Sequence, residues 1–341
     1  MLRLPAEWEH SHTLLIAWPH ENSDWNYMLD EVVECYTDIL RNATRFGKVI
    51  VATPDPIALR DYLKTTDIEI NNCIIAGVPT NDTWARDFGP ITLVDEEYRP
   101  VLLDFKFNGW GLKFASDKDN LITSRLFDSG FIKGEYANRL NFVLEGGSIE
   151  SNGKGVLLTT SECLLSPNRN GQFSREEIDE YLKENLHVSK VLWLDHGALA
   201  GDDTDSHIDT LARLAPDNTI LYVKCCDPGD EHYDNLSRME EQLSQMTDEN
   251  GEPFKLVALP HPAAIYDEDE VRLPATYANF LIFNHCVLVP IYNQPENDKA
   301  ALAAVKSVFK NHEVIGIDCN ALIRQHGSLH CVTMQLPGQP L

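Results

Sequence analysis

The chain is poor in positive charge. Its 341 residues include 28 Lys and Arg against 53 Asp and Glu, which gives a formal net charge of −25. Nucleic acids and anionic membrane surfaces are bound through positive potential, so neither is an expected partner. A strongly negative protein instead attracts small cations. The composition therefore favours a small cationic ligand.

Long apolar runs and organised cysteines are also missing. No stretch approaches the roughly 20 apolar residues that a membrane-spanning helix needs. The eight cysteines are scattered with no Cys-x-x-Cys pair, which argues against a disulfide framework and a zinc knuckle. Residues 1–10 include Pro5, Glu7 and Glu9, where an export signal would need a basic end and an apolar run. We expect a cytoplasmic protein, and the sequence leaves open whether it forms a homo-oligomer.

Apolar periodicity predicts an α/β fold in which strands and helices alternate. The helices expected to begin near residues 56, 116, 174, 231 and 298 start 57 to 67 residues apart. This spacing favours five strand–helix units repeated around an axis in a single domain, 1–341, although two unequal α/β domains would give the same pattern. In a radial array the loops at one end of the strands converge, so function would lie on loops.

The segment 201–209 reads Gly-Asp-Asp-Thr-Asp-Ser-His-Ile-Asp and holds four carboxylates within eight residues. These are Asp202, Asp203, Asp205 and Asp209. If partly buried, such groups repel one another and need a cation, which can be a metal, a basic side chain or a substrate. A solvated acidic surface loop is the ordinary alternative.

A metal is not the expected cation here. A calcium loop counted from Asp203 would place Ile208 where Gly is needed and Leu214 where a bidentate Glu is needed. A zinc site needs several His or Cys ligands, and His207 stands alone among carboxylates. An organic cation therefore remains.

Three further loops carry polar residues that packing does not explain, at 81–90, 145–147 and 327–331. Each also has an ordinary interpretation. Asp87 could pair with Arg86 or cap a turn, and Trp84 could be a core aromatic. Cys331 is expected in an apolar strand at 329–335, where a cysteine is usually a small buried hydrophobe.

Four motifs in these loops resemble one known family. They are Trp-x-Arg-Asp-x-Gly-Pro at 84–90, Leu-Glu-Gly-Gly-Ser at 144–148, Asp-x-His-x-Asp at 205–209 and Leu-His-Cys-Val-Thr at 329–333. Together they resemble the agmatine deiminase and bacterial (Porphyromonas-type) peptidylarginine deiminase family of guanidine-modifying enzymes. The resemblance covers nearly the whole chain and implies a five-bladed, pseudo-symmetric α/β propeller of the pentein type.

The resemblance also implies roles for four residues. Cys331 would be the nucleophile, His207 the general acid and base, and Asp87 and Asp209 the carboxylates that grip a guanidinium. The chemistry is consistent, because a delocalised guanidinium carbon is a poor electrophile that must be held rigidly beside a thiolate. Two carboxylates match the planar fork of its N–H groups. A covalent amidino-thioether then forms and is hydrolysed, with no metal or organic cofactor.

The expected substrate is agmatine, which would yield N-carbamoylputrescine and ammonia. Its methylene stem could pack on Trp84, and its distal amine could meet Asp82, Asp203 or Asp205; Glu145 is also assigned to substrate binding. Free arginine would need a cationic partner for its carboxylate, for which the motif loops offer only Arg86 and Arg324.

Alternatives remain open from the residues alone. They are peptidyl-arginine deimination, transfer of the amidino group to an amine, a Cys-His-Asp amidase, and a non-catalytic cation-binding or interaction module. The run 325–329 and Ser206 depart from the common family pattern, which leaves the shape of the loop before Cys331 and the choice of substrate undecided.

Overall fold

The structure is a computed structural model that describes residues 2–338. Its strands form five small sheets instead of one large one. The strands are β1 (Ser11–Ala17), β2 (Lys48–Thr53), β3 (Cys73–Gly77), β4 (Ile91–Val94), β5 (Pro100–Lys106), β6 (Glu135–Val143), β7 (Ile149–Ser151), β8 (Val156–Thr160), β9 (Lys190–Leu194), β10 (Ala212–Ala215), β11 (Thr219–Lys224), β12 (Lys255–Pro260), β13 (Leu281–Phe283), β14 (Cys286–Ile291), β15 (Glu313–Asp318) and β16 (Met334–Pro337).

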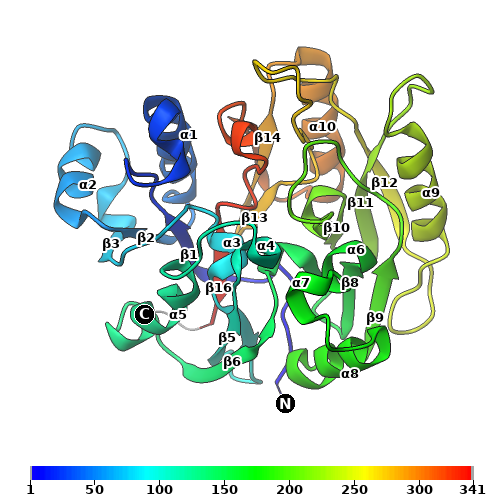
Figure 1. Ribbon diagram of the computed structural model, residues 1–341, viewed down its shortest axis with the longest axis horizontal. Helices are drawn as coiled ribbons and strands as arrows, with labels where there is room; N and C mark the ends of the chain where they lie inside the picture. The colour runs from blue at the N-terminus through cyan, green and yellow to red at the C-terminus, as the bar shows by residue number, and fades with distance from the viewer. Residues whose placement is uncertain (1, 339–341) are drawn as a thin grey trace.

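The helices lie mainly between the parallel strands of each sheet. They are α1 (Leu29–Ala43), α2 (Pro56–Leu63), α3 (Ala85–Phe88), α4 (Gly109–Leu112), α5 (Ile122–Asp128), α6 (Ser161–Leu164), α7 (Pro167–Asn170), α8 (Arg175–Leu186), α9 (Tyr233–Ser244) and α10 (Pro295–Val308). Short 3-10 turns include η4 (Gly146–Ser148) and η5 (Ile208–Thr210). In Figure 1 the five sheets surround α3 and α4.

One strand pattern recurs in all five sheets. A first strand runs antiparallel to the middle strand, and the next strand runs parallel to it, as in β4-β5-β6, β7-β8-β9, β10-β11-β12 and β13-β14-β15. The remaining sheet, β16-β1-β2-β3, takes its first strand from the end of the chain. The pairing of β16 with β1 thereby joins the two ends of the described chain in one sheet.

The predicted series of five helices needs one correction. In four sheets the helix before the third strand is α5, α8, α9 or α10, and its equivalent in the remaining sheet is α1, between β1 and β2. The helix predicted at Pro56 is α2, which instead connects β2 to the additional strand β3. The spacing suggested the right number of units but chose the wrong first helix, because β3 adds a second crossover to that sheet.

The first residues of several helices differ from those expected from the sequence. The helix expected near residue 174 begins with a capping box, in which the Ser174 hydroxyl accepts from the Glu177 N–H and the Glu177 carboxylate accepts from the Ser174 N–H. However, α10 begins at Pro295, before the start expected near 298, because proline suits the first helical turn. The helix expected near residue 116 begins only at Ile122, after a 3-10 turn, and the one expected near 231 begins at Tyr233.

The strand predicted at 329–335 is shorter and later than expected. β16 begins at Met334, and Cys331 lies in the turn that precedes it. The apolar residues around Cys331 are buried because this turn lies inside the molecule, not because it belongs to a sheet. An apolar run alone does not separate these two possibilities.

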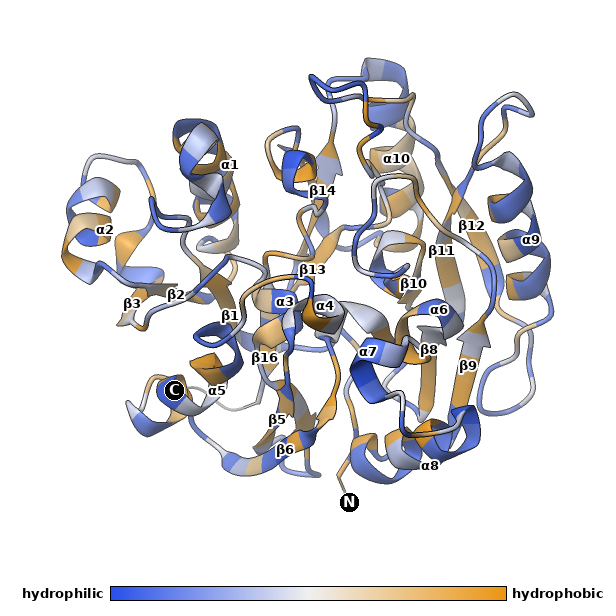
Figure 2. Ribbon diagram, viewed as in Figure 1, coloured by the Kyte–Doolittle hydropathy of each residue, from blue (hydrophilic) through white to orange (hydrophobic). Residues whose placement is uncertain are grey.

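Apolar side chains follow the sheets. Figure 2 shows hydrophobic residues concentrated on the strands and hydrophilic ones on the outward faces of helices such as α8 and α9. The larger core cluster includes Leu15, Ile50, Leu221 and Leu288, all fully buried. No helix within residues 2–338 is long and apolar enough to cross a membrane.

Because β1 is hydrogen-bonded to both β16 and β2, packing on β1 should dominate stability. Leu15 is fully buried and is the register partner of Met334. We expect Leu15→Ala to lower the free energy of unfolding by about 2–5 kcal/mol, measured by urea denaturation, through lost burial and a cavity. Ile57→Ala, at a side chain that is 74% exposed, should change it by no more than about 0.5 kcal/mol. Equal effects would contradict this packing.

Candidate active site

Three segments far apart in sequence carry the four residues that the resemblance singled out. Asp87 is in α3, His207 and Asp209 flank the start of η5, and Cys331 is in the turn before β16. All four side chains are buried. Each lies in or beside a loop or a single helical turn, as expected for groups that converge at one end of several sheets.

The four side chains meet. The Nδ1 atom of His207 lies 3.7 Å from Oδ1 of Asp87, and Sγ of Cys331 lies 3.8 Å from Oδ2 of Asp209. A methyl group on Gly147 would lie 2.7 Å from His207 Nδ1, 2.9 Å from Asp87 Oδ1 and 3.0 Å from Asp209 Oδ2. Gly147 in η4 therefore underlies the point where these side chains converge, and only a glycine leaves them room.

Asp87 is held by two N–H donors. Its Oδ2 accepts from Trp110 Nε1 at 2.9 Å, and its Oδ1 accepts from the Gly147 backbone N–H at 2.9 Å. Trp110 in α4 has φ = 53°, a left-handed conformation that is unfavourable for an aromatic residue. Such strain persists where the surrounding structure requires it, and here it places the indole N–H on Asp87.

Asn279, just before β13, is a site residue that the sequence reasoning missed. Its Oδ1 accepts from the His330 backbone N–H at 2.8 Å and lies 3.4 Å from Sγ of Cys331. It therefore anchors the turn that carries the thiol. The only sign of it in the sequence is a polar residue directly before the apolar run 280–283.

Buried polar atoms without a hydrogen-bond partner gather at this point. Seven such side-chain atoms occur in the part of the chain that the structure describes, and three of them are His207 Nδ1, His207 Nε2 and Asp209 Oδ1. Leaving a buried polar atom unpaired costs about 1–3 kcal/mol, so native structures keep few of them without reason. The concentration of three at one place indicates hydrogen-bonding capacity reserved for a ligand.

The electrostatics of the site favour a cation. Burial raises the pKa of Asp87 to about 6, although His207 opposes the shift. Burial also raises the pKa of the Cys331 thiol well above its usual value, and the carboxylates of Asp209 and Asp87 raise it further. Burial alone would lower the pKa of His207, but Asp87 and other neighbours outweigh it and raise that pKa well above its usual value. A positive charge between the two carboxylates would relieve these costs.

Two predicted substrate-binding carboxylates instead hold an arginine. Arg169 at the end of α7 donates from Nε to Glu145 Oε1 at 2.8 Å and from Nη1 to Asp205 Oδ2. Lys113 also donates to Asp205, at 2.8 Å. Glu145 and Asp205 thus lie near the site but are already neutralised by protein cations. Arg169 is in a segment that carries none of the recognised motifs, so the sequence reasoning overlooked it.

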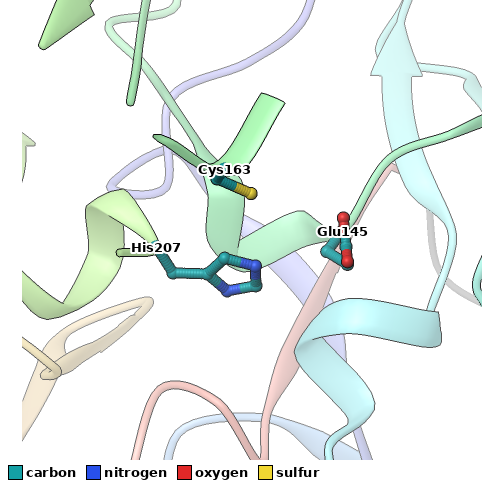
Figure 3. Close-up of side chains that lie close together, drawn as sticks. All are labelled: Glu145, Cys163 and His207. Atoms are coloured by element: carbon teal, nitrogen blue, oxygen red, sulfur yellow. The ribbon is translucent and has the colours of Figure 1, made fainter. Parts of the chain in front are cut away.

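Glu145 also borders His207. Figure 3 shows its carboxylate and the Cys163 thiol beside the His207 ring, and ligand atoms of all three lie within 4.8 Å of one another. Such a cluster could in principle hold a metal. However, the Arg169 guanidinium is bonded to Glu145 and already neutralises its charge, so the cluster does not need a metal.

The two other clusters of potential metal ligands among the described residues also contain an arginine. Arg272 donates to Asp230 in the cluster Asp230, His232 and His261. Arg213 donates to both carboxylates in the cluster Glu7, Glu150 and His330. A divalent cation beside a guanidinium would be repelled, so neither arrangement favours a metal.

The remaining predicted residues line a cavity that is also lined by Cys331. Asp82, Trp84 and Asp203 share its wall with Asp87, and the sequence reasoning missed Trp110, Phe114 and His326. Burial raises the pKa of Asp82 to about 6 and also raises that of Asp203. No Lys or Arg occurs among the lining residues that the structure describes. The lining of the cavity is therefore acidic and aromatic.

Comparison with known proteins gives a consistent set of relatives. A sequence model of the Porphyromonas-type peptidyl-arginine deiminase family matches residues 3–337. A Vibrio parahaemolyticus protein provisionally named agmatine deiminase is 32% identical, over 98% of this chain and 96% of its own length.

Two solved structures are similar to this chain over nearly its whole length. An agmatine deiminase of C. jejuni, crystallised as a Cys→Ser variant with substrate bound, has a TM-score of 0.92 and 40% identity, covering 100% of this chain and 98% of the other. A Porphyromonas gingivalis protein provisionally assigned as an arginine deiminase has a TM-score of 0.93 and 49% identity, covering 99% and 98%.

Gly147 offers a test of the convergence. We expect Gly147→Ala to fold normally but to slow alkylation of Cys331 by 2-chloroacetamidine at least about tenfold, because a displacement of about 1 Å can cost a hundredfold. Gly77→Ala is the matched control, since its nearest contact would be 3.4 Å away on Pro56. Mass spectrometry of the labelled thiol against time gives both rates. Equal rates would show that the three side chains do not meet above Gly147.

Proposed function

We propose that this chain, which belongs to the Porphyromonas-type peptidyl-arginine deiminase family, hydrolyses agmatine to N-carbamoylputrescine and ammonia. The observation that carries the proposal is the group of unpaired buried atoms on His207 and Asp209, beside Asp87 and the Cys331 thiol. A guanidinium is flat, cationic and rich in N–H donors, and it would satisfy such a site. The five sheets would be the blades of a pentein-type propeller forming one domain, in the cytoplasm.

In this mechanism Asp87 and Asp209 accept N–H groups of the guanidinium and hold its carbon near Cys331. Binding of the guanidinium releases the Cys331 thiol proton to solvent, and the thiolate attacks the carbon and forms a C–S bond. Protonated His207 gives its proton to one nitrogen, the C–N bond breaks and ammonia leaves, which produces an amidino-thioether. Neutral His207 then takes a proton from water, and the resulting hydroxide attacks the same carbon. The C–S bond breaks, the hydroxyl proton of the adduct passes to the departing sulfur, and the ureido product is released. The mechanism requires no metal or organic cofactor.

Substrate binding would also activate the nucleophile. In the free site the pKa of Cys331 is raised by burial, then by Asp209 and Asp87. A guanidinium bound between those carboxylates offsets their charge and favours the thiolate. The thiol is thus held protonated and unreactive until a cation of the right shape arrives. This arrangement would protect a buried thiol from neutral electrophiles.

The acidic cavity favours agmatine over free arginine. Asp82 and Asp203 line the approach to Cys331, where a distal amine would be attracted and an α-carboxylate repelled. Asp205 is less suited to that role than the sequence suggested, because Arg169 and Lys113 already bind it. Asp82 and Asp203 are therefore our candidates for the amine, with Trp84 beside the methylene stem.

Peptidyl-arginine is the second candidate. The matching family is described by that activity, and Phe114, which lines the cavity, is 41% exposed. A peptide lacks the free carboxylate that the acidic wall would repel, so charge alone does not exclude it. Direct assay separates the two substrates.

The central prediction concerns turnover. Purified protein should release ammonia from agmatine, at least about a hundredfold faster, judged by kcat/KM, than from arginine or an arginyl peptide, and Cys331→Ser should abolish release. The product should be N-carbamoylputrescine by mass spectrometry. Faster hydrolysis of the peptide would overturn the substrate assignment.

Two further outcomes point to the other reaction classes. Transfer of the amidino group to an added amine would indicate an amidinotransferase, and cleavage of neutral amides would indicate an amidase. If Cys331 reacts no faster with 2-chloroacetamidine than with neutral iodoacetamide, the protein lacks a guanidinium site.

The choice of substrate should depend on Asp203. We expect Asp203→Asn to raise KM for agmatine about tenfold or more with a smaller change in kcat, because the lost charge acts on the amine and not on the reacting carbon. Asp82→Asn tests the other candidate in the same way. Asp217→Asn is the matched control, at an exposed turn residue with φ = 59° that asparagine also tolerates. Unchanged KM in both cavity variants would place the amine elsewhere.

A further inference from the structure

His330, the residue before Cys331, joins the buried carboxylate of Asp209 to the partly buried carboxylate of Glu7. Its Nδ1 lies 2.7 Å from Oδ2 of Asp209, and its Nε2 lies 2.8 Å from Oε1 of Glu7. The imidazole is fully buried. Nothing in the proposed reaction uses this ring, although its partner Asp209 is one of the two carboxylates assigned to the guanidinium.

Glu7 is itself held firmly. Arg213 donates from Nη2 to Glu7 Oε2 at 2.5 Å, and Arg86 donates from Nη1 to Oε1 at 3.0 Å. Gln335 in β16 donates to Oε2 at 3.1 Å. Glu7 lines a different cavity from the one that leads to Cys331, together with Leu4, Pro5 and Ala6. The N-terminal segment therefore reaches the reacting centre through His330.

We propose that His330 and Glu7 are positioning residues, an inference that rests on the proposed function. His330 fixes the carboxylate of Asp209 so that Oδ1 faces the substrate, and Glu7 fixes the ring of His330. Neither residue touches the guanidinium.

The unequal surroundings of the two Asp209 oxygens support this role. Oδ2 bonds to His330, whereas Oδ1 is buried and has no protein partner within residues 2–338. Without the bond to His330 the carboxylate could rotate and exchange its two oxygens. Because Oδ2 is also 3.8 Å from Cys331 Sγ, that rotation would disturb the thiol and the guanidinium together.

The backbone of the same turn adds a second constraint. The His330 N–H donates to Asn279 Oδ1 at 2.8 Å, and the same oxygen is 3.4 Å from Cys331 Sγ. The ring that holds Asp209 and the thiol that attacks are thus adjacent residues anchored to one amide. Asn279 therefore helps to position both the His330 ring and the Cys331 thiol.

The bond has an electrostatic consequence as well. Burial alone would raise the pKa of Asp209, but the bond to His330, followed by the charges of His330, His207 and Arg213, lowers it. The ring is faced by Asp209, Glu7, Arg213 and Arg86. Losing the His330 bond should therefore raise the pKa of Asp209 and move the acidic limb of the kcat/KM profile to higher pH.

Replacing His330 by asparagine or by glutamine separates the roles of its two ring nitrogens. An asparagine amide can occupy the position of the histidine Nδ1 and keep a donor toward Asp209, whereas a glutamine amide reaches the Nε2 position near Glu7. We expect His330→Gln to lower kcat/KM for agmatine by about 10–100-fold with the shifted acidic limb. His330→Asn should retain activity to within about tenfold and keep the parental profile.

Glu7→Gln provides a second variant in case His330→Gln fails to fold, as judged by its thermal melt. It should lower kcat/KM by about three- to tenfold, with a shift in the same direction. Tyr136→Phe is the control, because it removes a hydrogen bond of 2.5 Å to the carboxylate of Asp104 in β5, and it should leave both kcat/KM and the profile unchanged.

The outcomes distinguish this inference from the proposed function. If the parent protein hydrolyses agmatine but His330→Gln and Glu7→Gln keep its rate and profile, the positioning role is wrong and the function stands. If the parent releases no ammonia, the function is wrong. The pH profile of Cys331 alkylation by 2-chloroacetamidine, compared across the same variants, then decides whether His330 sets the state of Asp209.

Discussion

Two buried carboxylates beside a buried thiol are the constraint on which this molecule depends. Asp87 and Asp209 share a cluster with Cys331, and within residues 2–338 neither is bonded to a guanidinium or ammonium group. Burying such charges is unfavourable unless a cation or several hydrogen bonds compensate. Trp110, Gly147 and His330 supply hydrogen bonds that reduce this cost. A cation bound between the two carboxylates would offset the remaining cost.

Elsewhere the protein treats its buried acids differently. Glu145 is paired with Arg169, and Glu150 with Arg213, all of them buried. The distinction explains why a chain with a net charge of −25 can still have a selective site. Overall charge draws any cation toward the surface, but a carboxylate that an arginine or lysine already neutralises is poorly suited to bind one. Selectivity thus follows from where the arginines are placed as much as from where the acids are.

The sequence allowed part of this to be anticipated. Asp87, His207, Asp209 and Cys331 lie in compact motifs, and the structure brings these four side chains together. Motifs did not reveal which acids are already paired: Asp205 and Glu145 both bind Arg169, whose segment has no distinctive pattern. Asn279 and the ring of His330 act through contacts across 52 and 121 residues of sequence. Local patterns carry no information about such contacts.

One part of the fold prediction, the choice of the first helix, was wrong for a related reason. Helical spacing suggested five units, but the sheet that pairs β16 with β1 is completed by the two ends of the chain, which periodicity cannot detect. That pairing has consequences for the site. It holds Gln335 beside Glu7 and thereby connects the N-terminal segment to the turn that carries Cys331. The strand β16, which pairs with β1, therefore directly follows the turn that carries Cys331, so the same pairing that joins the two ends of the described chain also anchors that turn.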